Sequence, residues 1–333
     1  MKRKAILSFL LALVMAVTSV MPAMAEEVPV AESEDGYLEN HYQIDLTNLD
    51  IDIDDGELEV EVQDDLSRRE EIEAEEDAET LEFLVDRYDD DLVDFIEESV
   101  EDAEENDRIL GAICMTECPL EPNEDGDYDR IEAADAKADD SPLIREAAAA
   151  NNATGAADHG GTINFSLVTS VSRESRKNSA GEYLYYATSK GVWSNKEFGT
   201  GKRPATGYDY IMQSTPGVIS SEGLNITYCN GKKVRATSDY YHCDGGTKWT
   251  EYALKDSGSY YGGELVSCAL ITGFRAKSST QTRKVNSYYV HTWSSMSVAV
   301  SVNASSSSGV SLSIAPSKSS KSWTAHGYVT FRF

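Results

Sequence analysis

Short apolar runs alternate with turn-forming residues from about residue 162 to the C-terminus. The runs are rich in Val, Ile, Thr, Tyr and Phe, and Gly, Ser, Asn and Asp separate them, which is the pattern of strands joined by turns. No apolar stripe of helical spacing interrupts them. We therefore predict an all-β C-terminal domain, an antiparallel sandwich or barrel. The expected strands are 162–168, 182–188, 224–228, 250–254, 265–274, 288–291, 295–302, 310–315 and 328–333.

The first half of the chain has a different pattern. Apolar and polar residues alternate over 42–46, 51–53 and 58–62, and the turn-forming sequence Asp54-Asp55-Gly56 lies between the last two runs, which predicts a hairpin. From Leu81 to Val100 the apolar residues recur at three- and four-residue steps, which predicts one amphipathic helix. We therefore expect a small, partly helical N-terminal region before the β domain.

The N-terminus has the order of residues found in secretion signals. Lys2, Arg3 and Lys4 precede the apolar run 5–20, and Ala23-Met24-Ala25 supplies small residues for cleavage after Ala25. The apolar run is short for a membrane-spanning helix of about 20 residues, so an uncleaved anchor is the weaker interpretation. We expect residues 1–25 to be a signal peptide and the protein to be secreted into the extracellular space.

Charge divides the rest of the chain into two parts. Residues 26–147 hold 47 Asp and Glu against 7 Lys and Arg, and residues 148–333 hold 11 against 19. The parts therefore carry net charges of −40 and +8. We predict an acidic pro-region or spacer over 26–147, a small-residue linker over 148–161 and a cationic domain over 162–333. Arg145 is either a processing site for an Arg-specific protease or an ordinary linker residue.

The opposite charges suggest that the two parts interact. The helical stripe needs an apolar surface to pack on, and its other faces are mostly acidic, so the cationic domain is the expected partner. The alternative is that the acidic residues keep a small independent helical unit in solution. A net charge of +8 over 186 residues is modest and no nucleic-acid-binding module is visible, so nucleic acid is not an expected partner.

The five cysteines predict one disulfide. A bond between Cys229 and Cys243 closes a short loop around several cations, and it contributes about 3 kcal/mol in the chain-entropy model. Cys268 is then either a buried thiol or a partner of Cys114, Cys118 or one of the other two.

One acidic stretch resembles an EF-hand calcium loop. Oxygen ligands recur at the positions that calcium loops use, but Glu replaces the usual first Asp, a proline follows it, and Cys118-Pro119 interrupts the entering helix. No cofactor is predicted, and calcium is left open. The candidate ligands are Glu121, Asn123, Asp125, Asp127, Asp129 and Glu132.

Catalytic motifs are missing from the sequence. It contains no G-x-S-x-G, no H-E-x-x-H and no complete phosphate loop, so we do not predict an enzyme. Cys268 with His291 or His326 as a base is the remaining catalytic candidate, and ordinary structural roles explain these residues equally well. All four Trp and fourteen of the eighteen Tyr lie in the cationic part, where they suit an anionic envelope, a glycan, a lipid interface or simply a core.

A second hairpin is expected near residue 305. Apolar residues alternate with Ser and Ala on both arms, as in a membrane-inserting hairpin, although each arm is short against the 9 to 11 residues that span a bilayer. An ordinary sandwich hairpin explains the same alternation. The apolar positions are Met296, Val298, Val300, Val302, Val310, Leu312 and Ile314.

The order of signal peptide, acidic leader and cationic β-rich module resembles that of secreted bacteriocin or toxin precursors of Gram-positive bacteria. The resemblance is in organisation only and matches no family motif, so it implies no site residues. It implies a precursor whose acidic region restrains a cationic β domain, which then acts as an antimicrobial on a bacterial envelope or membrane. The alternative is a cell-wall or glycan-binding adhesion module with an acidic spacer.

Overall fold

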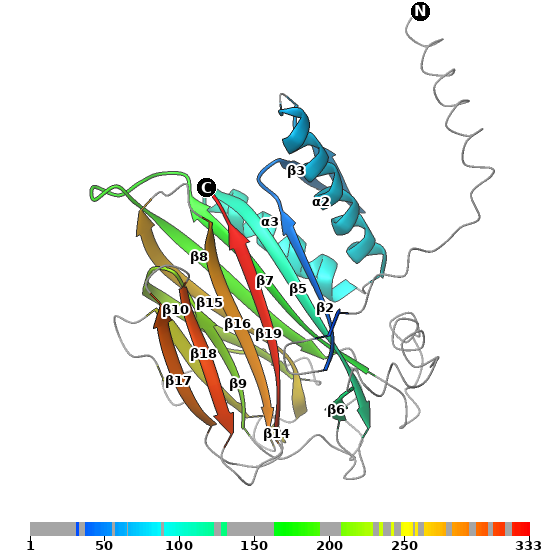
Figure 1. The fold of residues 1–333 in the computed structure, drawn as a ribbon, viewed down its shortest axis with the longest axis vertical. Coiled ribbons are helices and arrows are strands. Elements are labelled where there is room, and N and C mark those ends of the chain that lie inside the picture. The colour runs from blue at the N-terminus through cyan, green and yellow to red at the C-terminus, as the bar shows by residue number, and fades with distance from the viewer. Residues whose placement is uncertain are drawn as a thin grey trace, which may run out of the picture. The chain divides into compact units, whose positions relative to one another are not determined.

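A computed structural model describes most of the chain from Ala31 to Phe333 (Figure 1). All described residues belong to one unit, Ala31–Phe333. They are 31–32, 37–54, 57–64, 66–87, 90–122, 128–131, 163–193, 208–228, 233–235, 241–242, 248–255, 257–258, 263–277, 282–292, 298–305, 309–316 and 322–333.

The larger of two main sheets has ten antiparallel strands. Their order is β1-β2-β5-β7-β8-β15-β10-β11, with β6 paired to β5 and β14 paired to β15. Their bounds are β1 Ala31–Glu32, β2 Leu38–Asp45, β5 Arg108–Pro122, β6 Tyr128–Arg130, β7 Ile163–Glu174, β8 Glu182–Trp193, β10 Val218–Tyr228, β11 Lys233–Arg235, β14 Ser257–Gly258 and β15 Gly263–Lys277.

The smaller main sheet has five strands in the order β12-β13-β9-β16-β19. Two separate hairpins complete the β structure, and one of them, β3–β4, is the hairpin predicted around Asp54-Asp55-Gly56. The bounds are β3 Leu49–Asp54, β4 Glu57–Val62, β9 Tyr208–Ser214, β12 Tyr241–His242, β13 Trp249–Lys255, β16 Arg283–Thr292, β17 Val298–Ser305, β18 Gly309–Pro316 and β19 Ser322–Phe331.

Two helices lie where the sequence predicts one. α2 spans Arg68–Arg87 and α3 spans Asp90–Glu105, so the stripe from Leu81 to Val100 is divided between them. The apolar spacing fits one helix or two, because each of two consecutive helices can turn its part of the apolar stripe toward the protein core. Leu81 and Leu84 on α2 and Phe95 and Ile96 on α3 are all buried. α2 packs on β2 and β4, and α3 packs on β5 and β7.

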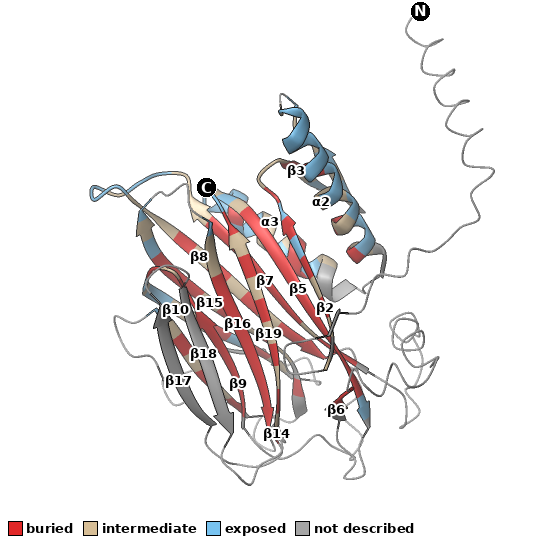
Figure 2. Ribbon diagram, viewed as in Figure 1, coloured by how far each residue is buried: buried red, intermediate tan, exposed pale blue. Residues whose placement is uncertain are grey.

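The two main sheets pack face to face as a sandwich. The largest apolar cluster joins Phe165, Leu167 and Trp193 of the large sheet to Tyr289 and Trp323 of the small one. Burial is concentrated in the central strands of both sheets, whereas α2 is mostly exposed (Figure 2). Apolar residues on alternate positions of each strand form this core. The antiparallel sandwich with a small, partly helical region before it is therefore confirmed.

A layer of polar side chains crosses the core between the sheets. Ser287 of β16 lies 2.9 Å from Thr169 of β7 and 2.6 Å from Ser189 of β8, measured between side-chain oxygens. Gln213 of β9 donates to Ser189 over 2.6 Å and accepts a bond from Thr272 of β15. All five residues are fully buried, so each hydroxyl and the amide depend on one another for hydrogen bonds.

The acidic segment is part of the large sheet. β5 pairs with β7 through twelve residue pairs from Arg108–Glu174 to Leu120–Ile163, and β2 pairs with the other edge of β5. β5 was not predicted, because its apolar run is buried on both faces and lacks alternation. Pro119 lies between the last β2 pair, at Glu117, and the first β6 pair, at Leu120, so its missing N–H removes no ladder bond on that edge.

Candidate functional site

The predicted processing and disulfide residues lie outside the described residues. They are Ala25, Arg145, Cys229 and Cys243, and Met296 of the predicted hairpin lies outside as well. The other apolar residues of that hairpin lie in β17 and β18. Val300 pairs with Ile314 and Val302 with Leu312, so the register places the alternating apolar positions on one face. Each arm has eight residues, and the choice between a membrane hairpin and a sandwich hairpin stays open.

Three cysteines are free thiols in the core. Cys114, Cys118 and Cys268 are all buried and unbonded, which excludes the alternative in which Cys268 pairs with either of the others. Burial raises the pKa of Cys114 and of Cys118 to about 12, and it also raises the pKa of Cys268. A thiol that stays protonated is a poor nucleophile, so these residues act as small apolar groups.

The calcium-like stretch is only partly described. Glu121 on β5 and Asp129 on β6 are directly opposite each other, and residues 123–127 between them lie outside the described residues. Within the described part of the chain, no three His, Cys, Asp or Glu side chains gather as a metal site. Calcium binding there stays a prediction.

A buried polar cluster surrounds Asp209 at the start of β9. The carboxylate accepts bonds from the Tyr289 hydroxyl and, over 3.0 Å, from the Thr292 backbone N–H, and His291 Nδ1 lies 3.1 Å away. Asp209, Tyr289 and His291 are fully buried, or nearly so, among aromatic rings. No substrate reaches a group with zero exposure, so we assign this cluster a structural role at the point where β16 ends.

The first candidate site is the seam between the acidic segment and β19. β19 is an edge strand, and side chains of the acidic segment occupy its outer backbone groups. Gln43 of β2 accepts from the Thr330 N–H over 3.1 Å and also donates to the Thr330 hydroxyl over 2.5 Å. Thr116 of β5 donates to the carbonyl of His326 over 3.4 Å. These bonds cover an edge that otherwise invites pairing with another strand.

Arg130 extends the seam toward the start of β19. Its Nη1 donates to the Thr324 carbonyl over 2.7 Å, and its Nη2 pairs with Glu39 of β2 over 2.9 Å. The Arg130 side chain is only 3% exposed, so this ion pair is largely shielded from solvent. Residues 324, 326 and 330 are all even, which means that their outer backbone groups lie on one edge of β19.

Two histidines lie at the seam, one on each side of it. The ring of His41 on β2 stacks on Tyr328, and the ring of His326 stacks on Tyr288, each at a centroid distance of 4.3 Å. Lys284 lies 3.6 Å above the Tyr328 ring. Burial first, and then the Lys284 charge, lower the pKa of each histidine from 6.5 to about 4. Both rings are therefore neutral at pH 7, and protonating them adds charge beside a lysine.

The second candidate site, here called the cationic end, is the end of the sandwich where β5 of the acidic segment meets β7, β8, β15, β16 and β19. Register places Arg173 opposite Tyr185 and Lys277 opposite Glu182, and Arg283 opposite Phe331 brings the small sheet to the same end. Most of these residues are far apart in sequence, so no local motif reveals them. The cationic end comprises Arg108, Arg173, Arg176, Lys177, Arg275, Lys277, Arg283 and Arg332.

Tyrosine rings hold several of these cations. The Arg108 guanidinium lies 3.5 Å from the centre of the Tyr186 ring, and that of Arg173 lies 4.1 Å from the centre of the Tyr183 ring. Arg283 donates to the Tyr185 hydroxyl over 3.1 Å. Stacking on aromatic faces keeps the guanidinium groups in place while they stay charged.

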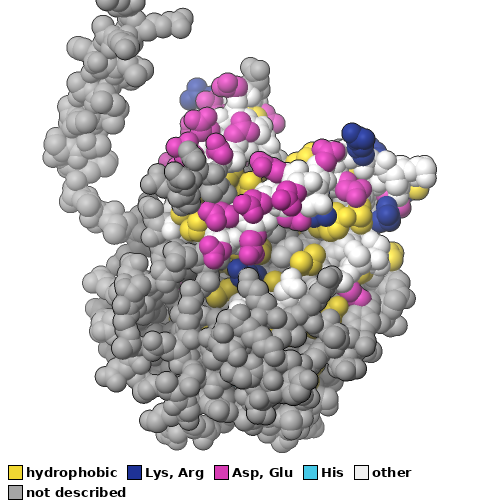
Figure 3. Space-filling model, turned by 180° about the vertical axis from the view of Figure 1, so that it is seen from behind, with side chains coloured by type: hydrophobic (Ala, Val, Ile, Leu, Met, Phe, Trp, Pro, Cys, Tyr) yellow, Lys and Arg dark blue, Asp and Glu magenta, His cyan; other side chains and the backbone are white. Residues whose placement is uncertain are grey.

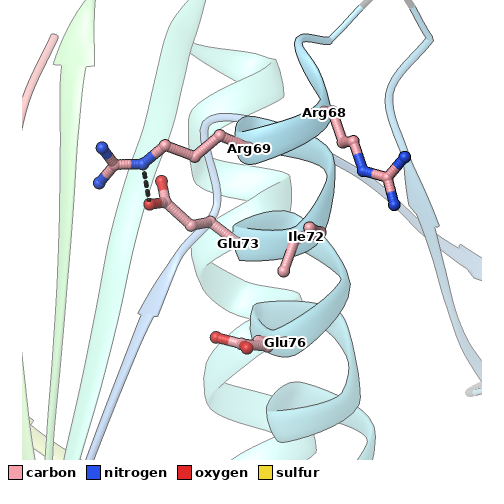
Figure 4. A pocket seen from close by; sticks show the side chains of 5 residues that line it. All are labelled: Arg68, Arg69, Ile72, Glu73 and Glu76. Atoms are coloured by element: carbon pink, nitrogen blue, oxygen red, sulfur yellow. Dashed lines mark hydrogen bonds and ion pairs between the residues drawn. The ribbon is translucent and has the colours of Figure 1, made fainter.

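The described surface also has a shallow hollow on α2. Side chains from successive turns of the helix line it, and Arg69 forms an ion pair there with Glu73 over 2.8 Å (Figure 4). Both side chains are mostly exposed to solvent, so this ion pair contributes little. The lining residues are Arg68, Arg69, Ile72, Glu73 and Glu76. We assign no site to it.

Comparison with known proteins gives no family. No family model and no curated protein matches the sequence. Among the helices of the described residues, none is both long and apolar enough to cross a bilayer.

Three solved structures are distant matches to this chain. The C-terminal domain of the Streptococcus pyogenes antigen I/II-family protein AspA is 12% identical over 52% of this chain, with a TM-score of 0.25. Clostridium perfringens delta-toxin is 11% identical over 51% of this chain and 88% of its own, also with a TM-score of 0.25. The match covers 54% of the streptococcal structure, so it spans about half the length of that C-terminal domain. A third structure, titled BspA_C_mut, is 8% identical over 67% of this chain and 92% of its own, with a TM-score of 0.21.

Proposed function

We propose that the protein is an exported precursor in which the acidic segment, residues 26–147, restrains the cationic β domain, residues 162–333, which acts on a bacterial envelope or membrane. The observation that carries the proposal is the insertion of β5 beside β7 through twelve residue pairs. Ending the restraint therefore requires β5 to leave the sheet and break its pairing with β7, and not only to dissociate from a surface.

Removing β5 changes the β domain in two ways. It opens the edge of β7 to pairing, and it takes Cys118 and Leu120 out of the core that they share with Phe165 and Leu167. Removing the acidic segment also breaks the hydrogen bonds of the seam and exposes the edge of β19. Unpaired edges and exposed apolar surface both drive association with other chains or membranes. The restrained form therefore keeps the reactive surfaces of the domain covered.

The charges of the two parts support the same proposal. The acidic segment and the cationic part carry −40 and +8, so attraction between them adds to the strand pairing. α3 also contacts the cationic part: Ser99 donates to Ser170 over 3.3 Å, and the Lys190 ammonium lies 5.9 Å from the Phe95 ring. α3 is therefore a second place where the acidic segment contacts the large sheet.

The test uses the mature chain with a specific protease site introduced in 148–161. We expect the intact chain to release little dye from anionic vesicles, and the cut chain to release at least about tenfold more once the acidic piece separates. A chain with a scrambled site, treated with the same protease, is the control. Equal release by intact and separated chains would sink the proposal. Retention on peptidoglycan without any release would favour the wall-binding module instead.

A further inference from the structure

The cationic end gathers exposed positive charge from several separate segments. Arg176 and Lys177 lie in the turn between β7 and β8, Arg275 and Lys277 end β15, and Arg332 follows β19, and all five are exposed. Figure 3 shows dark-blue side chains at the projecting edge of the molecule, and magenta acids lie beside them as well as over the helices. Neighbouring strands lie about 4.8 Å apart and packed sheets about 10 Å apart. The charges are therefore spread over an area that suits an extended anionic surface better than one small ion.

Apolar side chains are exposed among these cations. Ile109, opposite Arg173, is 40% exposed, and Val218, opposite Arg275, is 49% exposed. They are two of the four large apolar residues that are exposed in the described part of the chain, and the other two lie on α2. Half-buried tyrosines lie between the same cations. Cations mixed with aliphatic and tyrosine side chains suit the boundary between lipid headgroups and acyl chains.

We propose that the cationic end binds an anionic lipid bilayer, with its Arg and Lys side chains contacting headgroup phosphates and Val218 entering the headgroup layer, joined in the uncut chain by Ile109 of the acidic segment. This inference rests on the proposed envelope-directed function and names the surface that makes the contact. A soluble polyanion uses the cations equally well but has no use for the two aliphatic side chains.

The acidic segment supplies Arg108 and Ile109 to this surface and also places acids beside it. Asp102 in the last turn of α3 forms an ion pair with Arg108 within the segment, and Asp107 accepts a 2.9 Å bond from the Ser175 hydroxyl in the turn after β7. The last turn of α3 carries no basic residue and several exposed acids. Their charges repel an anionic bilayer at short range, so the acidic segment weakens membrane binding by the intact chain.

The test measures co-sedimentation of the intact mature chain with vesicles of phosphatidylcholine containing about 30% phosphatidylglycerol. Each Lys or Arg near an anionic surface contributes about fivefold in partitioning, so Arg176→Glu with Lys177→Glu should lower binding about 25-fold or more. The matched control is Arg68→Glu with Arg69→Glu on α2, which changes the net charge equally and should leave binding within about twofold. Neutral vesicles should bind weakly.

Three results would overturn the inference. One is an equal loss in both double variants, which means that only net charge matters. Another is equal binding to neutral and anionic vesicles. The third is that Ile109→Ser with Val218→Ser leaves vesicle binding unchanged while soluble polyphosphate binds equally well, which identifies a polymer ligand.

This test is independent of cutting the chain. Binding of the uncut chain that depends on Arg176 and Lys177 supports the inference even if cutting changes no activity, and that second result would refute only the restraint. Conversely, dye release that depends on cutting but survives the Arg176→Glu and Lys177→Glu changes keeps the restraint and rejects this surface.

Discussion

Asp209 shows how one buried residue fixes the positions of two neighbouring strands, β9 and β16. Its carboxylate serves Tyr289, His291 and the Thr292 backbone, which lie on β16. Burying a carboxylate costs several kcal/mol, and the surrounding donors compensate for it only while all of them are in place. The cluster therefore specifies how β9 and β16 meet.

Replacing Asp209 should be strongly destabilising. Asp209→Ala leaves three buried polar groups without their acceptor, so we expect the free energy of unfolding to fall by about 3 to 5 kcal/mol. Asp209→Asn keeps one side-chain oxygen and should cost clearly less. Urea unfolding followed by tryptophan fluorescence measures both, and equal small losses would show that the cluster is not needed for stability.

The three core thiols should resist modification. Their raised pKa values keep the reactive thiolate scarce, and their burial blocks reagents from the native protein. After brief treatment with iodoacetamide at pH 8, peptide mass spectrometry should find Cys114, Cys118 and Cys268 unmodified, and in 6 M guanidinium chloride all three should react. Rapid labelling of Cys268 in the native state would contradict its place in the core.

Single residues were the least predictable level from sequence. The alternation in the cationic part places Phe165 and Leu167 on the core face without further information. The partners of Gln43 and Arg130 depend on which strand lies beside β19, and that pairing joins residues about 200 to 290 positions apart. The cationic end could not be predicted from the sequence for the same reason, since strand register and not sequence spacing brings its residues together.

At the scale of elements, β5 and the seam determine what the acidic segment does. Local patterns predicted the hairpin β3–β4 and the helical region, because both depend on short-range spacing. β5 contains Cys114, Cys118 and Pro119, which resemble a loop when they are read alone. Its assignment as a strand needs β2 on one edge and β7 on the other, and neither is visible in a local pattern.

Acid should loosen the seam. The pKa of His41 and of His326 is 6.5 unfolded and about 4 folded, so the unfolded chain takes up protons first as the pH falls. Their contribution to the free energy of unfolding is fully present above about pH 6.5. It is lost as the pH falls toward 4, by up to about 3 kcal/mol for each histidine. Burial raises the pKa of Asp77 to about 6, which acts in the opposite direction over the same range.

Two variants separate the effect of the histidines on the pH dependence of unfolding from the effect of Asp77. His41→Gln with His326→Gln should flatten the pH dependence of unfolding between pH 6.5 and 4, and Asp77→Asn should steepen it. Thermal unfolding across this range measures both effects. An unchanged pH profile in the double histidine variant would show that other groups control the seam.

At the scale of the whole molecule, opposite charges and shared strands make the acidic segment part of the fold. Composition alone predicted the charge division and the β-rich half, because these properties are sums over many residues. It did not predict that a segment with a charge of −40 supplies strands to the large sheet. The longest of those strands, β5, contains a mostly apolar run, and the surrounding acids conceal it in any average.

The most direct test of the account follows the two pieces after the chain is cut in 148–161. Size-exclusion chromatography should show both pieces eluting together at pH 7.5, because β5 stays paired with β7, and separating near pH 4, where the seam histidines become charged. Dye release from anionic vesicles should appear only with the separated β piece. Immediate separation at pH 7.5, or full release while the pieces are still together, would contradict the restraint by strand pairing.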